Sequence, residues 1–371
     1  MIHKLSDKQI KEGWQVVKFG EIAREVKLTS KKPDEDGLEF YVGLDHLDPQ
    51  SLRIVRKGII SEDKPSFTRR FSKGQILFAK RRCYQKKAAV ANFDGICSSD
   101  IIVIEAIPQK MIAGLLPFII QSDAFFDWAE RTSSGSLSPR TKWKSLAEFK
   151  FPLPPVERQK EILEVLEKVE ACIYAALSAN DKGKVFWNAF KQTHIIHNDI
   201  SSYKKASGIF KLTSGKPKTK AKLNMFSKNN SVPVYGGNGL NGYTSKALVD
   251  EPVIVIGRVG EYCGSIHLVN KPTWITDNAL YTTKISSSID IKYLSIVLRV
   301  LNLNNYKSRS GQPLITQKNI GDLNIFVPNK KKQQEIVFVY NALSSTKERL
   351  SKQEKILYSI RQKAIKEITS Y

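Results

Sequence analysis

Two stretches decide the fold of this 371-residue chain: FPLPPVERQKEI at residues 151–162 and FVPNKKKQQEI at residues 326–336. Each runs from an apolar residue through proline into a glutamine followed two and three positions later by glutamate and isoleucine. The two glutamines, Gln159 and Gln333, lie 174 positions apart (333 − 159), and the proline, glutamate and isoleucine around them keep this spacing. A fixed spacing over several positions indicates an internal repeat.

The sequences just upstream match in the same order. SSGSLSPRTKWKSLAEFKF leads into the first copy, and RSGQPLITQKNIGDLNIF leads into the second. Both run from a Ser-Gly pair through polar residues to an acidic residue and alternating apolar ones. Two adjacent matching pieces, each followed by the same helical pattern, favour a duplicated unit over chance similarity.

A long helical pattern follows each copy, with apolar residues at steps of three and four. They are Ile162, Leu166, Val169, Ile173 and Ala176 in the first, and Ile336, Val339, Leu343, Leu350, Leu357, Ile360, Ala364 and Ile368 in the second. This spacing is that of a coiled-coil seam, and a preceding proline suits a helix start. At 1.5 Å per residue each helix would reach about 50–60 Å. The two helices are expected to pack on each other or on a partner.

The first helical pattern contains one weak point. Asn180, Asp181 and Gly183 interrupt it before the apolar residues resume at Val185. Because asparagine, aspartate and glycine all favour non-helical backbone, the sequence predicts a kink or break there.

The residues before each helix predict two β-rich units. Strand-like runs lie at residues 75–79, 88–91 and 101–104 with a helix near 116–131, and again at 253–256, 264–269 and 279–283 with a helix near 291–301. The predicted class is α+β. The predicted domains are a first unit at 1–154, a spacer helix region at 155–201, a second unit at 202–328 and a C-terminal spacer helix at 329–371.

Charge and composition narrow the class of protein. The 59 Lys and Arg against 36 Asp and Glu give a net charge of +23, which points to a polyanionic partner, nucleic acid first and an anionic membrane surface second. A merely basic globular protein is the alternative. The four cysteines form no CxxC pair, and the chain shows no signal-peptide stretch and no membrane-length apolar run. A cytoplasmic protein with reduced thiols is therefore expected.

The chain resembles the specificity (S) subunit of type I restriction–modification systems. The resemblance rests on FYVGLDHLDPQSLRI, FSKGQILFAKRRCYQKKAAVANFDGICSSDI and SSGSLSPRTKW in the first unit, and on PVYGGNGLNGYT, VIGRVGEYCGSIHLVN, TDNALY and SRSGQPLITQ in the second. It covers nearly the whole chain, and the duplicated order of the motifs is more specific than any one motif. It implies two target recognition domains in pseudo-two-fold arrangement, separated by two long helices packed as an antiparallel coiled coil.

The same resemblance implies a function. Each recognition domain would read one half of a bipartite DNA site, and the helices would set the spacer and dock adenine-N6 methyltransferase subunits. Motor–nuclease subunits are a further partner in systems that also cleave. The chain itself would be non-catalytic, with S-adenosylmethionine, ATP and Mg²⁺ belonging to the partners.

Candidate DNA-contacting residues follow from side-chain chemistry, because Lys and Arg reach phosphates while Arg and Asn can read base edges. The first unit offers Arg69, Arg70, Lys80, Arg81, Arg82, Tyr84, Lys86 and Lys87, with Arg140 and Lys142 near its Ser-Gly turn. The second offers Lys216, Lys218, Lys220, Lys222, Asn238, Asn241, Tyr243 and Arg258, with Lys307, Arg309 and Gln312 near its own Ser-Gly turn. Solvated basic hairpins and purely structural turns are the alternative interpretation.

No catalytic, cofactor or metal site is predicted. The glycines at 237, 239 and 242 match a dinucleotide fingerprint but lead into Tyr-Thr-Ser without a convincing helix. The sequence has no GxxxxGK[ST] and no Asn-Pro-Pro-aromatic tetrapeptide, and His194 and His197 lack a cluster of further ligands. Two alternatives stay open: a stand-alone nuclease or methyltransferase with an unrecognised site, and a coiled-coil protein adaptor.

Overall fold

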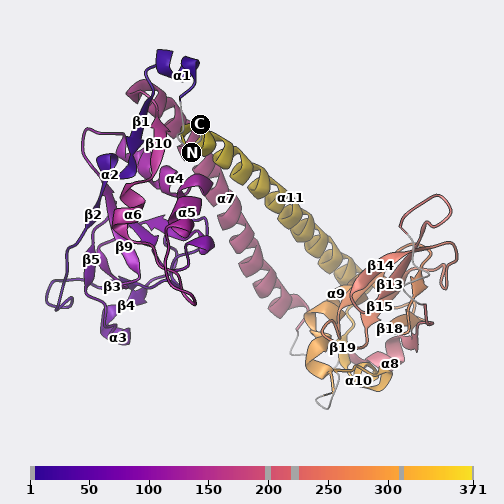
Figure 1. The fold of residues 1–371 in the computed structure, drawn as a ribbon. Helices are drawn as coiled ribbons and strands as arrows, with labels where there is room; N and C mark the ends of the chain where they lie inside the picture. The colour runs from indigo at the N-terminus through magenta and orange to yellow at the C-terminus, as the bar shows by residue number, and fades with distance from the viewer. Residues whose placement is uncertain (1–4, 197–201, 219–224, 309–312, 370–371) are drawn as a thin grey trace. The chain divides into compact units, whose positions relative to one another are not determined.

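The computed structural model describes residues 5–196, 202–218, 225–308 and 313–369 (Figure 1). Its contacts divide the chain into two compact units, Met1–Leu177 with Lys352–Tyr371, and Ser178–Ser351. Each unit mixes helices with strands and includes part of each long helix, α7 (Val156–His194) and α11 (Lys330–Thr369). The predicted α+β class is confirmed, and the domain boundaries at 154, 201 and 328 stay a prediction.

The first unit contains two four-stranded sheets. One is antiparallel, in the order β2 (Ala23–Val26), β9 (Ile101–Ala106), β6 (Ile76–Ala79) and β7 (Ala88–Val90). The other has the order β4 (Gly58–Ile59), β3 (Phe40–Val42), β8 (Gly95–Cys97) and β5 (Arg69–Phe71), with β3 and β8 parallel. A separate pair joins β1 (Gln15–Lys18) to β10 (Lys150–Leu153), the strand just before α7. The three predicted strands of this unit are confirmed as β6, β7 and β9.

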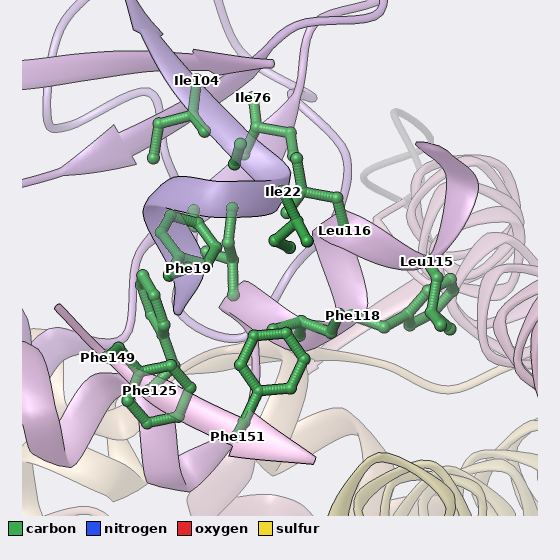
Figure 2. Close-up of a cluster of buried hydrophobic side chains, with 14 of the residues drawn as sticks. Phe19, Ile22, Ile76, Ile104, Leu115, Leu116, Phe118, Phe125, Phe149 and Phe151 are labelled. Atoms are coloured by element: carbon green, nitrogen blue, oxygen red, sulfur yellow. The ribbon is translucent and has the colours of Figure 1, made fainter. Parts of the chain in front are cut away.

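Aromatic and aliphatic side chains fill the core of the first unit (Figure 2). Phe19 of α2 (Phe19–Ile22) lies with its ring 4.6 Å from that of Phe125, and Phe149 stacks near Phe151 with ring centroids 5.7 Å apart. This cluster also takes in Ile162 and Leu166 of α7, so the long helix is part of the core of the unit.

The single helix predicted at 116–131 is wrong, because the structure has two helices, α4 (Leu116–Ile120) and α5 (Asp123–Arg131). The interruption has a local cause. Ser122 accepts a hydrogen bond from the backbone N–H of Phe125 at 3.0 Å and so caps α5. Gln121, which is buried, donates its amide to the carbonyls of Ala88 and Ser51, which fixes the backbone between the two helices.

The second unit repeats this plan. Its antiparallel sheet has the order β12 (Lys211–Ser214), β18 (Ala279–Thr283), β15 (Val253–Gly257) and β16 (Ile266–Val269), and a smaller one has the order β14 (Gly239–Thr244), β13 (Val232–Gly236) and β17 (Trp274–Ile275). The pair β11 (Tyr203–Lys205) and β19 (Asn324–Phe326) precedes α11. The helix predicted near 291–301 is confirmed as α9 (Ile291–Val300), and the three predicted strands are confirmed as β15, β16 and β18.

The side chain of a buried glutamine joins the start of each long helix to the rest of its unit by hydrogen bonds. Gln159 and Gln333 each donate their amide at 2.8 Å to the carbonyl of the proline five residues earlier. Their side-chain oxygens accept backbone N–H groups, from Ile112 at 3.0 Å in the first unit and from Asp290 at 2.7 Å in the second. The repeat seen in the sequence therefore includes two equivalent hydrogen bonds in each unit.

Of the kink or break predicted in α7, the break is wrong, because the helix is continuous from Val156 to His194, and the kink stays a prediction. Glycine inside a helix costs only about 1 kcal/mol relative to alanine, which packing can offset. Asp181 also forms an ion pair with Lys184 one turn later at 2.8 Å, and within the second unit the ring of Trp187 contacts that of Tyr340 on α11. Among the described residues, no helix combines the length and apolar character needed to cross a membrane.

The two long helices pack antiparallel. In the first unit Arg158 at the start of α7 bonds to Glu367 near the end of α11, whereas Glu170, further along α7, meets the earlier residue Arg361. The predicted seam residues of α7 are all buried, and so are Ile336 and Ile368 of α11. Ile360 is a wrong seam prediction, since it is 42% exposed while Arg361 beside it is fully buried.

The buried Arg361 connects three segments of the first unit. It bonds to the Glu170 carboxylate at 3.0 Å and to the carbonyl of Gln50 at 2.9 Å, and its guanidinium lies 4.7 Å from the ring centre of Tyr358. A buried charge needs such partners because removal from water costs several kcal/mol per ion. This interaction joins both long helices to the segment that follows β3.

We predict that Arg361→Met destabilises the chain by about 3–5 kcal/mol, because it leaves the Glu170 charge buried without its partner. The double variant Glu170→Leu, Arg361→Met should lose less than the single one. The control is Arg158→Met, which removes a half-exposed pair on the same helices and should cost at most about 1 kcal/mol. Urea unfolding of the full chain measures all three, and equal losses for Arg361→Met and Arg158→Met would contradict the prediction.

A second prediction concerns pH and His267 on β16. Burial lowers the pKa of His267 and the charge of Arg299 lowers it further. The unfolded chain, with a histidine pKa of about 6.5, therefore binds this proton more readily than the folded one. Stability from the neutral ring should be complete above about pH 6.5 and should decline as the pH falls through the lower folded-state pKa.

The measurement is the urea midpoint of the full chain from about pH 7 to about pH 5. His267→Gln should flatten the decline, whereas His46→Gln in the first unit controls for the loss of a histidine as such. A wild-type decline that His267→Gln leaves unchanged would refute this assignment.

Candidate nucleic-acid interface

The first unit carries a dense basic turn after β6. Five of the eight residues from 80 to 87 are Lys or Arg and none is acidic. The short 3₁₀ turn η1 (Cys83–Gln85) lies in its middle, and Arg82 and Lys86 on either side have left-handed backbone, with φ of 57° and 51°. Such backbone is uncommon outside glycine and asparagine, so the turn has a specific shape.

The Ser-Gly turn lies directly against this basic turn. Arg82 donates its backbone N–H to the carbonyl of Pro139 at 2.9 Å, and Thr141 donates to the carbonyl of Lys80 at 3.0 Å. Arg81 and Arg140 are paired in an isolated antiparallel bridge. Two groups of candidates that lie about 60 residues apart in sequence therefore form one surface.

Asp100 lies at the centre of this surface. Its carboxylate accepts from Nε and Nη2 of Arg140 at 2.8 and 3.4 Å, and from Nη1 of Arg81 at 3.4 Å. The hydrogen bond from Arg140 and the charges of both arginines hold the pKa of Asp100 below its usual value, although burial opposes this. The sequence analysis did not single out Asp100. The only local feature that could have indicated it is its position as a lone acidic residue between a Ser-Ser pair and the apolar run of β9.

Other candidates of the first unit are engaged within the chain. Arg69 pairs with Glu25 at 3.0 Å, Lys86 with Asp123 at 2.5 Å, and Lys87 donates to the carbonyl of Leu44 at 2.7 Å. Arg70 is half-buried on β5, in a different sheet from the basic turn. The candidates with exposed side chains on or beside the two turns are Arg82, Tyr84, Arg140 and Lys142.

The second unit has the same backbone junction. Gly260 donates to the carbonyl of Pro313 at 3.0 Å, and Ile315 donates to that of Arg258 at 2.9 Å. Arg258 corresponds to Lys80 with an offset of 178 (258 − 80), and Pro313 corresponds to Pro139 with the offset of 174 (313 − 139) found for the glutamines.

A thiol supports each junction. Cys83 donates its S–H to the carbonyl of Lys80 at 3.4 Å, and Cys263 donates to that of Arg258 at 3.2 Å. Burial raises the pKa of both thiols, so both stay protonated donors near neutral pH. All four cysteines are free, as the sequence predicted.

Arg258 is the centre of the second surface. Its backbone N–H donates to the carbonyl of Asn278 at 3.0 Å, and its guanidinium donates to the Ser214 hydroxyl at 3.3 Å. The turn between β13 and β14 lies beside it, since a β-carbon at Gly237 would be 3.2 Å from the Asn278 carbonyl. The exposed Asn238 is therefore brought close to the Arg258 segment.

The remaining candidates of the second unit are more dispersed. Asn241 is exposed on β14, and the ring of Tyr243 contacts that of Phe226. Lys218 lies over the ring of Trp274 with Nζ 3.9 Å from its centre, while Lys216 is exposed. Lys307 is exposed after η5 (Leu303–Tyr306) and lines a shallow hollow with three asparagines. Lys220, Lys222, Arg309 and Gln312 lie outside the described residues.

The two surfaces differ in the side chains that the shared backbone carries. Asp100 is replaced by Asn278 and Arg81 by Val259, both with an offset of 178 (278 − 100, 259 − 81), and Arg140 is replaced by Leu314 at 174 (314 − 140). Val259 and Leu314 pair in the same isolated bridge as Arg81 and Arg140. The two units thus share the backbone hydrogen bonds of the junction, whereas the side chains at the aligned positions differ.

Comparison with known proteins gives two curated relatives of this chain. The chain is similar to the EcoDI specificity subunit of a type I restriction enzyme from Escherichia coli, with 28% identity over 163 residues, 44% of this chain and 36% of that protein. It is also similar to the EcoprrI specificity subunit from the same organism, with 32% identity over 101 residues, 27% of this chain and 25% of that protein. The matches thus span between a quarter and about a third of these relatives.

Two solved structures share the fold over nearly the whole length. The type I S subunit from M. genitalium aligns with a TM-score of 0.60 at 16% identity, covering 100% of this chain and 98% of that one. A chain of a type I R-M system solved to describe complex assembly and conformational transition aligns with a TM-score of 0.54 at 19% identity, covering 98% of each.

The model of the type I restriction modification DNA specificity domain matches this chain twice, at residues 11–179 and 201–357. Those two ranges contain both junction surfaces, both buried glutamines and much of both long helices. The chain therefore belongs to the family of type I restriction–modification DNA specificity proteins.

Proposed function

We propose that this chain is the DNA specificity subunit of a type I restriction–modification complex and that each unit reads one half of a bipartite duplex site. The observation that carries this proposal is the repeated junction, in which a strand end forms one surface with residues 139–141 in the first unit and with residues 313–315 in the second. The net charge of +23 favours a polyanion as the ligand of these surfaces.

Different side chains on one framework suit a protein that reads two different half-sites. Phosphate contacts position a protein on DNA without reading sequence, while base-edge contacts specify it. The exposed Arg82 and Lys142 supply phosphate contacts in the first unit. The aligned positions that differ between the units supply the base contacts, so the two half-sites differ in sequence.

The long helices act as the spacer and the docking surface for methyltransferase subunits. Each helix contributes to both compact units. Phe338 of α11 is 74% exposed, and Val185 and Phe186 of α7 are exposed as well. A partner that covers these apolar side chains would remove them from water. S-adenosylmethionine, ATP and Mg²⁺ are then used by the partners, and the chain itself has no catalytic role.

The test is selection of duplexes from a random pool by the full chain with its methyltransferase partner. The expected result is one bipartite motif with two defined halves, bound with an affinity that falls steeply as salt is raised. Selection of no motif favours a protein adaptor instead. Turnover by the purified chain alone, with DNA, Mg²⁺ and S-adenosylmethionine, would show that the chain is itself a nuclease or methyltransferase.

Lengthening the helices tests the spacer. Seven residues inserted after Leu177 in α7 and seven after Ser351 in α11 keep the seam in register, because its period is about 3.5 residues. The added length of about 10 Å corresponds to about three base pairs. We expect selected sites with the same half-sites and a longer gap. Insertion into α7 alone is the control, which should lower stability, and altered half-site bases would contradict the prediction.

A further inference from the structure

Only some of the N–H donors of the Arg140 guanidinium form hydrogen bonds within the chain. Asp100 engages one side of it, through Nε and Nη2. Arginine has five N–H donors in a fixed plane, so the opposite end keeps both hydrogens of Nη1 and the outer hydrogen of Nη2. Among the described residues Nη1 has no partner, and the side chain is 48% exposed, so a ligand can reach this end.

Arg81 has a different part in the same cluster. It donates Nη1 to Asp100 at 3.4 Å and Nη2 to the Ser138 hydroxyl at 3.0 Å, so both ends of its guanidinium are engaged. It therefore supports the carboxylate from a second side. The Asp100 side chain itself is only 17% exposed and remains ionised between the two cations.

The free end of Arg140 fits one class of ligand. It presents two parallel N–H donors, and guanine presents two adjacent acceptors, O6 and N7, in the major groove. A phosphate could also accept them, but the carboxylate of Asp100 repels a phosphate that approaches the same group. The nearby Arg82 and Lys142 form no ion pair with an acidic side chain among the described residues, so they are better placed to hold phosphates.

We propose that Arg140 reads a guanine in the half-site bound by the first unit, and that Asp100 is the positioning residue that aims it. This inference rests on the proposed function and identifies one base that the first unit reads. The carboxylate fixes the arginine before DNA arrives, so less conformational freedom is lost on binding. The second unit has Leu314 and Asn278 at the aligned positions, so it does not read guanine by this arrangement.

The experiment uses the full chain with its methyltransferase partner and the duplex pool described above. Photo-crosslinking from each half of the selected site identifies the half that contacts residues 5–154. We expect a guanine at one position of that half. Arg140→Lys keeps the charge but loses the paired donors, so preference for that guanine should fall about 10- to 100-fold. Asn278→Ala, at the position of the second unit that aligns with Asp100, should leave the bases selected in this half unchanged.

Asp100→Asn separates positioning from mere structural support. Removal of the carboxylate adds one net positive charge, so binding to non-specific duplex should strengthen and depend more steeply on salt. Preference for the guanine should fall in the same variant. A purely structural role would instead weaken specific and non-specific binding together, along with the unfolding midpoint, and that outcome overturns the proposal.

A probe that needs no variant completes the test. Replacing the selected guanine by 7-deazaguanine removes the N7 acceptor and should weaken wild-type binding about 10-fold at that position alone. A bipartite motif whose first half is insensitive to both Arg140→Lys and 7-deazaguanine overturns this inference and leaves the proposed function standing. No motif at all with the wild-type chain overturns the proposed function itself.

Discussion

A buried glutamine amide at the start of each long helix is the interaction on which the architecture depends. Gln159 and Gln333 each satisfy the carbonyl of the preceding proline and a backbone N–H from a distant part of the same unit. A buried polar group that loses its partners costs about 1–3 kcal/mol, so these hydrogen bonds hold the first turn of each helix against the rest of its unit.

The second constraint is the junction between a strand end and a later segment of the same unit, residues 139–141 in the first unit and residues 313–315 in the second. It uses backbone groups and a buried thiol, which do not depend on the exposed side chains. The exposed positions can therefore change without loss of the fold. Asp100 and Asn278 occupy equivalent places, yet one organises two arginines and the other does not. This separation of framework from contact groups is what a family of sequence-reading proteins requires.

The fold was largely predictable because its signals are local. Strands such as β9 and β15 are short apolar runs, and α11 shows an apolar period along most of its length. The failures came where a long-range contact outweighed local preference. Gln121 bonds to β7 and separates α4 from α5. Contact with α11 accompanies the continuity of α7 at Gly183. Arg361 is buried because a carboxylate on the other long helix pairs with its charge.

The candidate interface, like the fold, has features that the sequence predicted and features that only long-range contacts decided. The sequence by itself determined the duplication, the two helical seams and the places where basic residues gather, since all three depend on spacing and composition along the chain. Only the tertiary structure decided that residues 80–87 and 139–141 form one surface around Asp100, and that Arg69 lies in another sheet. The physical reason is that a backbone hydrogen bond between segments about 60 residues apart leaves no periodic trace in either segment.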